Sequence, residues 1–173
     1  MTKPLIAVAA LALGLVPGMV SAGHLNAVLE ADLDGREEVD PDAGERRIVG
    51  DPNGRGEIYV FGIDGDPLTL CYVLLVDKIA ETEEAPGGGR AAHIHEGQRG
   101  ANGGVVANLA WPQDGQAGDC LTEGEAGKFP TNEAGIVQRI LNNPSDFYVN
   151  VHNANYPSGA IRGQLESTQD HAD

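Results

Sequence analysis

Three of the five histidines lie in two segments that are far apart in the chain, and their spacing suits a metal site. His93 and His95 alternate within residues 91–97, and His152 ends the strand-like run 147–152. Side chains two apart on a strand point to the same face, so His93 and His95 should share the outward, polar face of their strand. Neutral imidazoles bind copper and zinc, and histidine is neutral above about pH 6.5. We therefore predict a copper or zinc site formed by His93, His95 and His152.

Three further residues are candidates to support this site. Glu96 directly follows His95 and could be a metal ligand or accept a hydrogen bond from an imidazole N–H. Asn150 alternates with Val149 and Val151, which we expect to point inward, so Asn150 should point outward with His152. Arg162 lies in the last strand-like segment and is expected to line the same site. We predict no catalytic residue.

The same histidines also fit a simpler interpretation as exposed side chains of an ordinary β-sandwich, hydrogen-bonded to Asn, Glu or backbone groups. The two interpretations differ in geometry. Shared coordination at about 2.0–2.1 Å requires the three rings to converge within about 4–5 Å of one another. Rings that point apart would exclude a common metal.

The surrounding chain is predicted to consist of short strands separated by turns. It contains 24 glycines and 10 prolines, which favour turns over long helices. The spacing predicts an all-β fold, an antiparallel β-sandwich that is Greek-key-like and superoxide-dismutase-like, with one short helix. We expect strands over residues 25–33, 56–63, 68–79, 91–95, 105–111, 147–152 and 160–166, and irregular segments over 34–53, 81–89 and 113–130.

The predicted helix covers residues 131–142. Thr131 is placed to cap its first turn, and its apolar residues fall on one stripe. Pro144 follows shortly after and ends it. The stripe consists of Ile136, Val137, Ile140 and Leu141.

The amino-terminal residues 1–22 have the features of a secretory signal peptide. Lys3 precedes an uncharged apolar run over residues 5–20, and small residues place the cleavage site after Ala22. No later segment is long and apolar enough to span a membrane. We expect a mature domain over 23–167, a polar tail over 168–173, and a secreted or periplasmic location.

Cys71 and Cys120 are the only two cysteines. An even number in an exported chain favours a disulfide, which would close a loop of about 50 residues. The alternative is two separate thiols, with Cys71 buried in its apolar run.

The chain has a formal net charge of −15. So acidic a chain repels nucleic acids and anionic membranes and attracts cations. We expect no nucleic-acid partner, whereas a protein partner of unknown identity is compatible with this charge.

Four segments make the chain resemble a CHRD (chordin-type) domain: Ala92-His93-Ile94-His95, the glycine-rich residues 97–104, Tyr148-Val149-Asn150-Val151-His152, and residues 156–165 (YPSGAIRGQL). The resemblance covers roughly residues 25–165, and it departs most at Glu38-Val39-Asp40-Pro41. Bacterial members of this family are typically exported single-domain proteins. The growth-factor antagonism of chordin is not carried over to this acidic single domain.

A second resemblance is to copper–zinc superoxide dismutase. His93 and His95 match that family's H-x-H pair, His152 matches its late histidine, and Arg162 loosely resembles its active-site arginine. The bridging histidine and the zinc ligands have no counterpart. We predict an exported CHRD binding module that binds copper, or zinc, rather than an enzyme. The alternatives are a metal-free structural or protein-interaction module, and a copper-dependent dismutase-like oxidoreductase.

Overall fold

The computed structural model describes residues 27–39, 48–82 and 91–168. The predicted signal peptide over 1–22 and most of the predicted polar tail, residues 169–173, lie outside the described residues. Among the described helices, none has the length and apolar character needed to cross a bilayer.

Within the described residues, nine strands form one antiparallel sheet, so the predicted all-β class is confirmed. The strand order is β5-β4-β7-β8-β1-β2-β3-β6, with β9 paired to β1. The predicted last strand over 160–166 is divided between β8 and β9. The strands are β1 (Val28–Asp34), β2 (Arg55–Ile63), β3 (Asp66–Asp77), β4 (Ala92–Glu96), β5 (Val105–Leu109), β6 (Gln116–Thr122), β7 (Phe147–Val151), β8 (Ile161–Gln164) and β9 (Glu166–Ser167).

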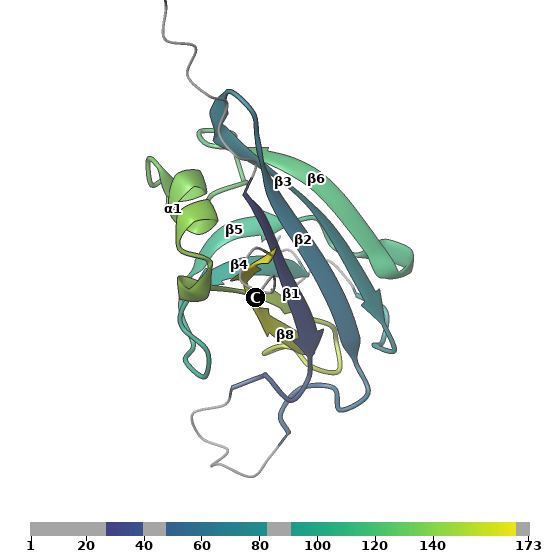
Figure 1. Cartoon of the computed structure of the whole chain (residues 1–173). Coiled ribbons are helices and arrows are strands. Elements are labelled where there is room, and N and C mark those ends of the chain that lie inside the picture. Colours follow the sequence, from purple (N-terminus) through teal and green to yellow (C-terminus); the bar gives the residue numbers. More distant parts are fainter. Residues whose placement is uncertain (1–26, 40–47, 83–90, 169–173) are drawn as a thin grey trace, which may run out of the picture.

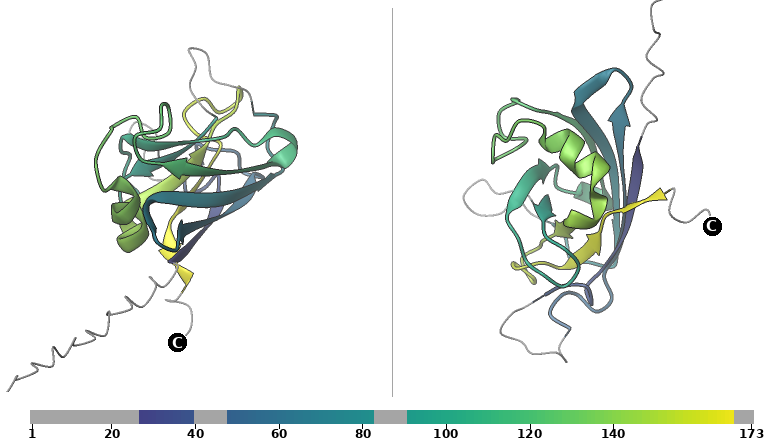
Figure 2. Two further views of the ribbon diagram at one scale, coloured as in Figure 1. Left: turned by 90° about the horizontal axis from the view of Figure 1, so that it is seen from above. Right: turned by 60° about the vertical axis from the view of Figure 1, so that its left-hand side comes forward.

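The sheet curves over itself into two layers (Figures 1 and 2). Strands β1, β2, β3 and β6 form one layer, and β8, β7, β4 and β5 form the other. The connections β3–β4, β5–β6 and β6–β7 cross between layers, as a Greek-key arrangement requires. Apolar side chains of both layers meet in the core, including Ile58, Leu70, Ile94, Val149 and Val151, all fully buried.

The sheet is nearly closed, because its two outermost strands, β5 and β6, approach each other. Contacts next to these strands bridge the opening. The Tyr72 hydroxyl of β3 accepts a hydrogen bond from the Ala110 backbone N–H at 2.6 Å. The Asn108 N–H donates to the Lys128 carbonyl at 2.8 Å. These bonds satisfy backbone groups that an open sheet edge would leave to solvent.

The one α-helix of the described residues, α1 (Ile136–Asn142), begins later than the predicted start at residue 131. Thr131 does not cap it. Instead the carboxylate of Glu123, which follows β6, accepts hydrogen bonds from the backbone N–H groups of Gly135 at 2.8 Å and Val137 at 2.9 Å. A distant side chain therefore fixes the start of the helix. The predicted apolar stripe is confirmed, since all four of its residues are buried.

The prediction that residues 113–130 are irregular is wrong for residues 116–122, which form strand β6. Its sequence, QAGDCLT, lacks clear alternation, and Leu121 is its one buried side chain. It forms because it pairs with β3 over seven positions, from Thr69↔Thr122 to Leu75↔Gln116. Pairing with a strong neighbouring strand outweighs weak local propensity here.

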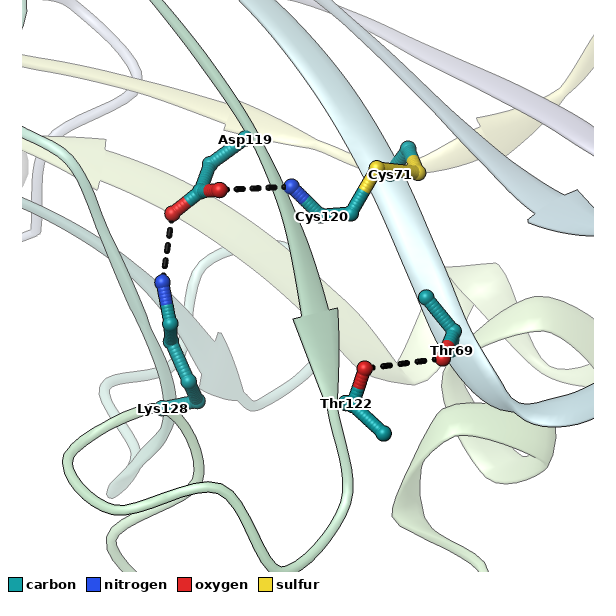
Figure 3. Close-up of a disulfide and its surroundings, with 6 residues drawn as sticks. All are labelled: Thr69, Cys71, Asp119, Cys120, Thr122 and Lys128. Atoms are coloured by element: carbon teal, nitrogen blue, oxygen red, sulfur yellow. Dashed lines mark hydrogen bonds and ion pairs between the residues drawn. A yellow bond between two sulfur atoms is a disulfide. The ribbon is translucent and has the colours of Figure 1, made fainter.

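A disulfide joins Cys71 to Cys120, which confirms the predicted pairing (Figure 3). The two residues lie directly opposite each other on β3 and β6. The hydroxyls of Thr69 and Thr122 are hydrogen-bonded at 2.9 Å in the same strand pair. Disulfides persist in oxidising compartments, so this bond is typical of proteins outside the cytoplasm.

Removal of the disulfide should destabilise the fold. The cysteines are 49 positions apart. Closing such a loop limits the unfolded chain and contributes about 4 kcal/mol. We expect the Cys71→Ala/Cys120→Ala variant to lose up to this amount in urea unfolding. An unchanged free energy of unfolding would contradict this expectation.

Candidate metal centre

The pairing of β4 with β7 brings the two histidine segments together. His93 lies opposite Asn150, and His95 lies opposite Tyr148. On the other face, Ile94 faces Val149 within the core, as predicted for the inward residues. The register therefore places the polar side chains of both strands on one face.

His152 lies one residue beyond β7, but its backbone still follows the ladder. Its N–H donates to the Ala91 carbonyl at 2.7 Å. The imidazole packs edge-on to that of His93, with ring centroids 5.3 Å apart. The centroids of His93 and His95 are 5.6 Å apart, and those of His95 and His152 are 6.4 Å apart.

The three rings converge. One ligand nitrogen from each lies within 4.8 Å of the other two, so the structure brings the predicted metal ligands together. Nitrogens bound to one metal at about 2.0–2.1 Å are roughly 3.3–3.6 Å apart. A bound ion would therefore draw these nitrogens inward by about 1 Å.

Hydrogen bonds fix the tautomers of two histidines. Nδ1 of His95 lies 3.0 Å from the Gly103 carbonyl, and Nδ1 of His152 lies 3.2 Å from the Pro157 carbonyl. A carbonyl only accepts, so both Nδ1 atoms carry the proton, and the lone pair is left on Nε2. Three ring nitrogens are buried and have no hydrogen-bond partner among the described residues: Nδ1 of His93, Nε2 of His95 and Nε2 of His152.

The environment keeps these imidazoles neutral. Burial, together with the neighbouring His152 and His95, lowers the pKa of His93 to about 4. Burial also lowers the pKa of His95 and of His152, partly opposed in each case by the backbone carbonyl that the ring contacts. Neutral imidazole is the form that binds a metal.

Two loops hold the imidazoles from the outside, so the face predicted to point outward is largely covered. The Gly103 carbonyl accepts a hydrogen bond from Nδ1–H of His95, and the Gly103 N–H donates to the Tyr148 hydroxyl at 3.2 Å. A Cβ at Gly103 would collide with the Glu96 carbonyl, so this close approach requires glycine. The Asn153 side chain accepts two backbone N–H bonds from Asn155 and Tyr156 and so shapes the loop that presents the Pro157 carbonyl.

Tyr148 is a neighbour of the site that the sequence analysis missed. Its ring stacks on His95, with centroids 4.8 Å apart and planes 10° apart. The Arg162 guanidinium lies 3.4 Å from the centroid of the Tyr148 ring. The two-residue period of a strand could have identified Tyr148, because it lies two residues from Asn150 and shares its face.

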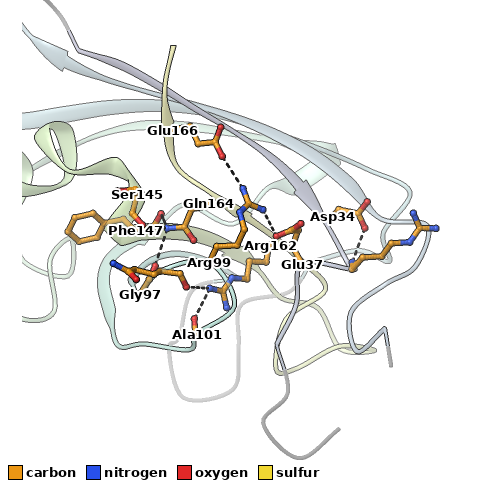
Figure 4. A network of polar contacts seen from close by, with 12 residues as sticks. Asp34, Glu37, Gly97, Arg99, Ala101, Ser145, Phe147, Arg162, Gln164 and Glu166 are labelled. Carbon is orange, nitrogen blue, oxygen red and sulfur yellow. Dashed lines mark hydrogen bonds and ion pairs between the residues drawn. The ribbon is translucent and has the colours of Figure 1, made fainter. Parts of the chain in front are cut away.

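Arg162 supports the site indirectly. It is buried and donates to the Asn102 side chain at 3.0 Å and to the carbonyls of Ala101 at 2.6 Å and Gln98 at 3.3 Å. It thereby anchors the glycine-rich turn that carries Gly103. Figure 4 shows Arg162 reaching Ala101, and Gln164 reaching Gly97 of the same turn.

Glu96 is not brought to the histidines. Its carboxylate forms a two-bond ion pair with Arg139 of α1, at 2.8 and 2.9 Å. Nearly half of its side chain is exposed, at 47%. Neighbouring side chains on a strand point to opposite faces, which separates Glu96 from His95.

Glu38 is the second residue that the sequence analysis did not assign to the site. It follows β1, and its Oε2 accepts a hydrogen bond from the Asn150 side chain at 3.3 Å. Burial raises its pKa to about 7, although Arg162 and Asn150 favour its charged form. The residues Glu38, Val39, His95, Tyr148, Asn150 and His152 line part of a pocket of about 430 Å³.

The fold and this cluster define an all-β domain with a three-histidine candidate metal centre. The chain belongs to the CHRD domain family, whose family model matches residues 29–165. This match confirms the family that the sequence motifs indicate. Comparisons with curated proteins and with solved structures gave no match.

The tautomers can be tested in the metal-free protein. We expect ¹⁵N NMR at neutral pH to show Nδ1–H imidazoles at His95 and His152, because each Nδ1 faces a carbonyl. His93 should stay neutral until the pH approaches 4. Nε2–H signals from either residue would contradict the assignment.

Acid should destabilise the metal-free fold through His93. Its folded pKa is about 4 against an ordinary value of 6.5. Between these values only the unfolded chain binds the proton, so the contribution of His93 is complete above pH 6.5 and is lost towards pH 4. We expect urea titrations to show that the difference in free energy of unfolding, wild type minus His93→Gln, decreases as the pH is lowered from 6.5 to 4. A difference that does not depend on pH would oppose this account.

Proposed function

We propose that this chain is an exported CHRD-domain protein that binds one transition-metal ion, copper, through His93 Nδ1, His95 Nε2 and His152 Nε2. The observation that carries the proposal is the convergence of the three imidazoles, each of which offers one nitrogen within 4.8 Å of the other two. Each ring also has one buried nitrogen without a hydrogen-bond partner among the described residues. The predicted signal peptide and the disulfide support export.

The simpler interpretation accounts for only part of this arrangement. Hydrogen bonds to backbone carbonyls satisfy the Nδ1–H groups of His95 and His152. They leave one buried nitrogen of each imidazole without a partner among the described residues, and an unsatisfied buried polar atom costs about 1–3 kcal/mol. A single cation would satisfy all three, and the two Nδ1–H bonds are the outer contacts that orient metal-binding histidines.

The donor set favours copper. Three imidazoles suit copper and zinc, and the general order of affinity for divalent ions places Cu(II) above Zn(II). The acidic chain, with its net charge of −15, attracts either cation. Zinc is therefore the competing metal in any test.

A specific observation also favours a protein-interaction role. Tyr59, Val73 and Leu75 are exposed by 40%, 44% and 42% on the outer side of β2 and β3. Tyr59 and Val73 are directly paired across the strands. This apolar strip lies on the layer that does not carry the histidines, so a protein contact there is compatible with metal binding.

No contact among the described residues favours the dismutase-like alternative. A steered reaction with an anion would use a cationic group at the mouth of the site. The Arg162 guanidinium is instead held by carbonyl groups and the Tyr148 ring. We therefore propose binding and not catalysis.

Calorimetric titration of the mature chain, residues 23–173 prepared without added histidines, tests the metal site. We expect one copper ion to bind per chain, with weaker binding of zinc. The His93→Gln/His152→Gln variant should lose at least a hundredfold in affinity, because only one imidazole of the site remains.

The matched control is the His24→Gln/His171→Gln variant, which alters the two histidines outside the described residues. We expect it to bind copper as the wild type does. Binding that survives in the first variant but disappears in the second would place copper at the termini and refute the three-histidine site.

A further inference from the structure

Two buried oxygen atoms beside the histidines also lack hydrogen-bond partners among the described residues. They are Oδ1 of Asn150 and Oε1 of Glu38. Asn150 is only 4% exposed, so solvent does not readily satisfy its oxygen. Both residues line the pocket that His95 and His152 also line.

The five unpaired atoms of this region have one chemical character. With the His93 proton on Nε2 and Glu38 ionised, each offers a lone pair: three imidazole nitrogens, one amide oxygen and one carboxylate oxygen. A metal ion accounts for the three nitrogens, whereas the two oxygens require hydrogen-bond donors. Asn150 faces His93 across the strand pair and lies two residues before His152, so its side chain lies beside the proposed ion.

We propose that the metal keeps an open coordination position in this pocket, where Glu38 and Asn150 accept hydrogen bonds from a small ligand that carries O–H or N–H groups. This inference rests on the proposed metal site. Water occupies the position at rest and is replaced by small molecules of the same donor class. Three protein ligands leave such a position in metal sites that act on exogenous ligands. The pocket, at about 430 Å³, is far larger than the roughly 30 Å³ of one water.

The fold holds Glu38 in place for this role. Gly159 adopts a φ of +142°, and a Cβ there would collide with the Glu38 carboxylate. Gly50 approaches the Glu38 side chain from another segment, where a Cβ would lie 2.6 Å from its Cγ. Asn150 donates to Oε2, which leaves Oε1 for the ligand. An acceptor-only anion gains no hydrogen bond from these two oxygens and is repelled by the carboxylate.

Electron paramagnetic resonance of the copper(II)-loaded mature protein in ¹⁷O-enriched water tests the open position. We expect line broadening by one coordinated water. An absence of broadening in a sample that calorimetry shows to contain bound copper would overturn this inference and leave the metal site standing. An absence of copper binding would refute the proposed function, and this inference with it.

Azide, which has no hydrogen to donate, tests the part played by Glu38. We compare Glu38→Gln with Glu37→Gln, which makes the same charge change at a side chain paired with Arg99 outside the pocket. At pH 8 the amide of the Glu38→Gln variant can donate a hydrogen bond to azide. The dissociation constant of azide, measured by absorbance, should therefore fall about tenfold in this variant, whereas that of Glu37→Gln should stay within twofold of the wild type. Equal azide affinities in the two variants would overturn the role of Glu38. The ¹⁷O measurement needs no variant and decides the open position by itself.

Discussion

The antiparallel register of β4 and β7 is the constraint on which the rest of the site depends. It is set on the apolar face, where Ile94 meets Val149 and Ala92 meets Val151 within the core. A slip of one residue would turn these side chains to the opposite face and expose them. The hydrophobic core therefore determines that His93 and His95 lie beside the end of β7, where His152 follows.

Burial of the polar face gives the cluster its chemical character. The glycine-rich turn, the loop that carries Pro157 and the Glu38 segment cover a face that in many antiparallel sheets is open to water. Covering it lowers the pKa of all three histidines and raises that of Glu38. The result is a group of neutral imidazoles and polar oxygens held close together under the covering loops, the arrangement on which the proposed metal site rests.

Arg162 connects these parts. Its guanidinium binds the turn that orients His95 and lies over the Tyr148 ring that stacks on His95. It also stabilises the charged form of Glu38. The residue that resembles a dismutase arginine thus supports the site structurally. The disulfide and the exposed apolar strip lie on the opposite layer.

Features that have a local cause could be predicted from the amino-acid sequence. Strand alternation placed His93 and His95 on one face and Val149 and Val151 in the core, because the two-residue period of a strand depends only on the backbone. The disulfide between the two cysteines and the CHRD family were likewise predicted from the sequence. Tertiary structure decided the start of α1, which depends on Glu123, and the existence of β6, which depends on β3. It also decided that Glu96 turns to Arg139 while Glu38 and Tyr148 join the site. These outcomes rest on contacts between segments that are distant in sequence, and no local pattern of residue types specifies which of those segments will meet.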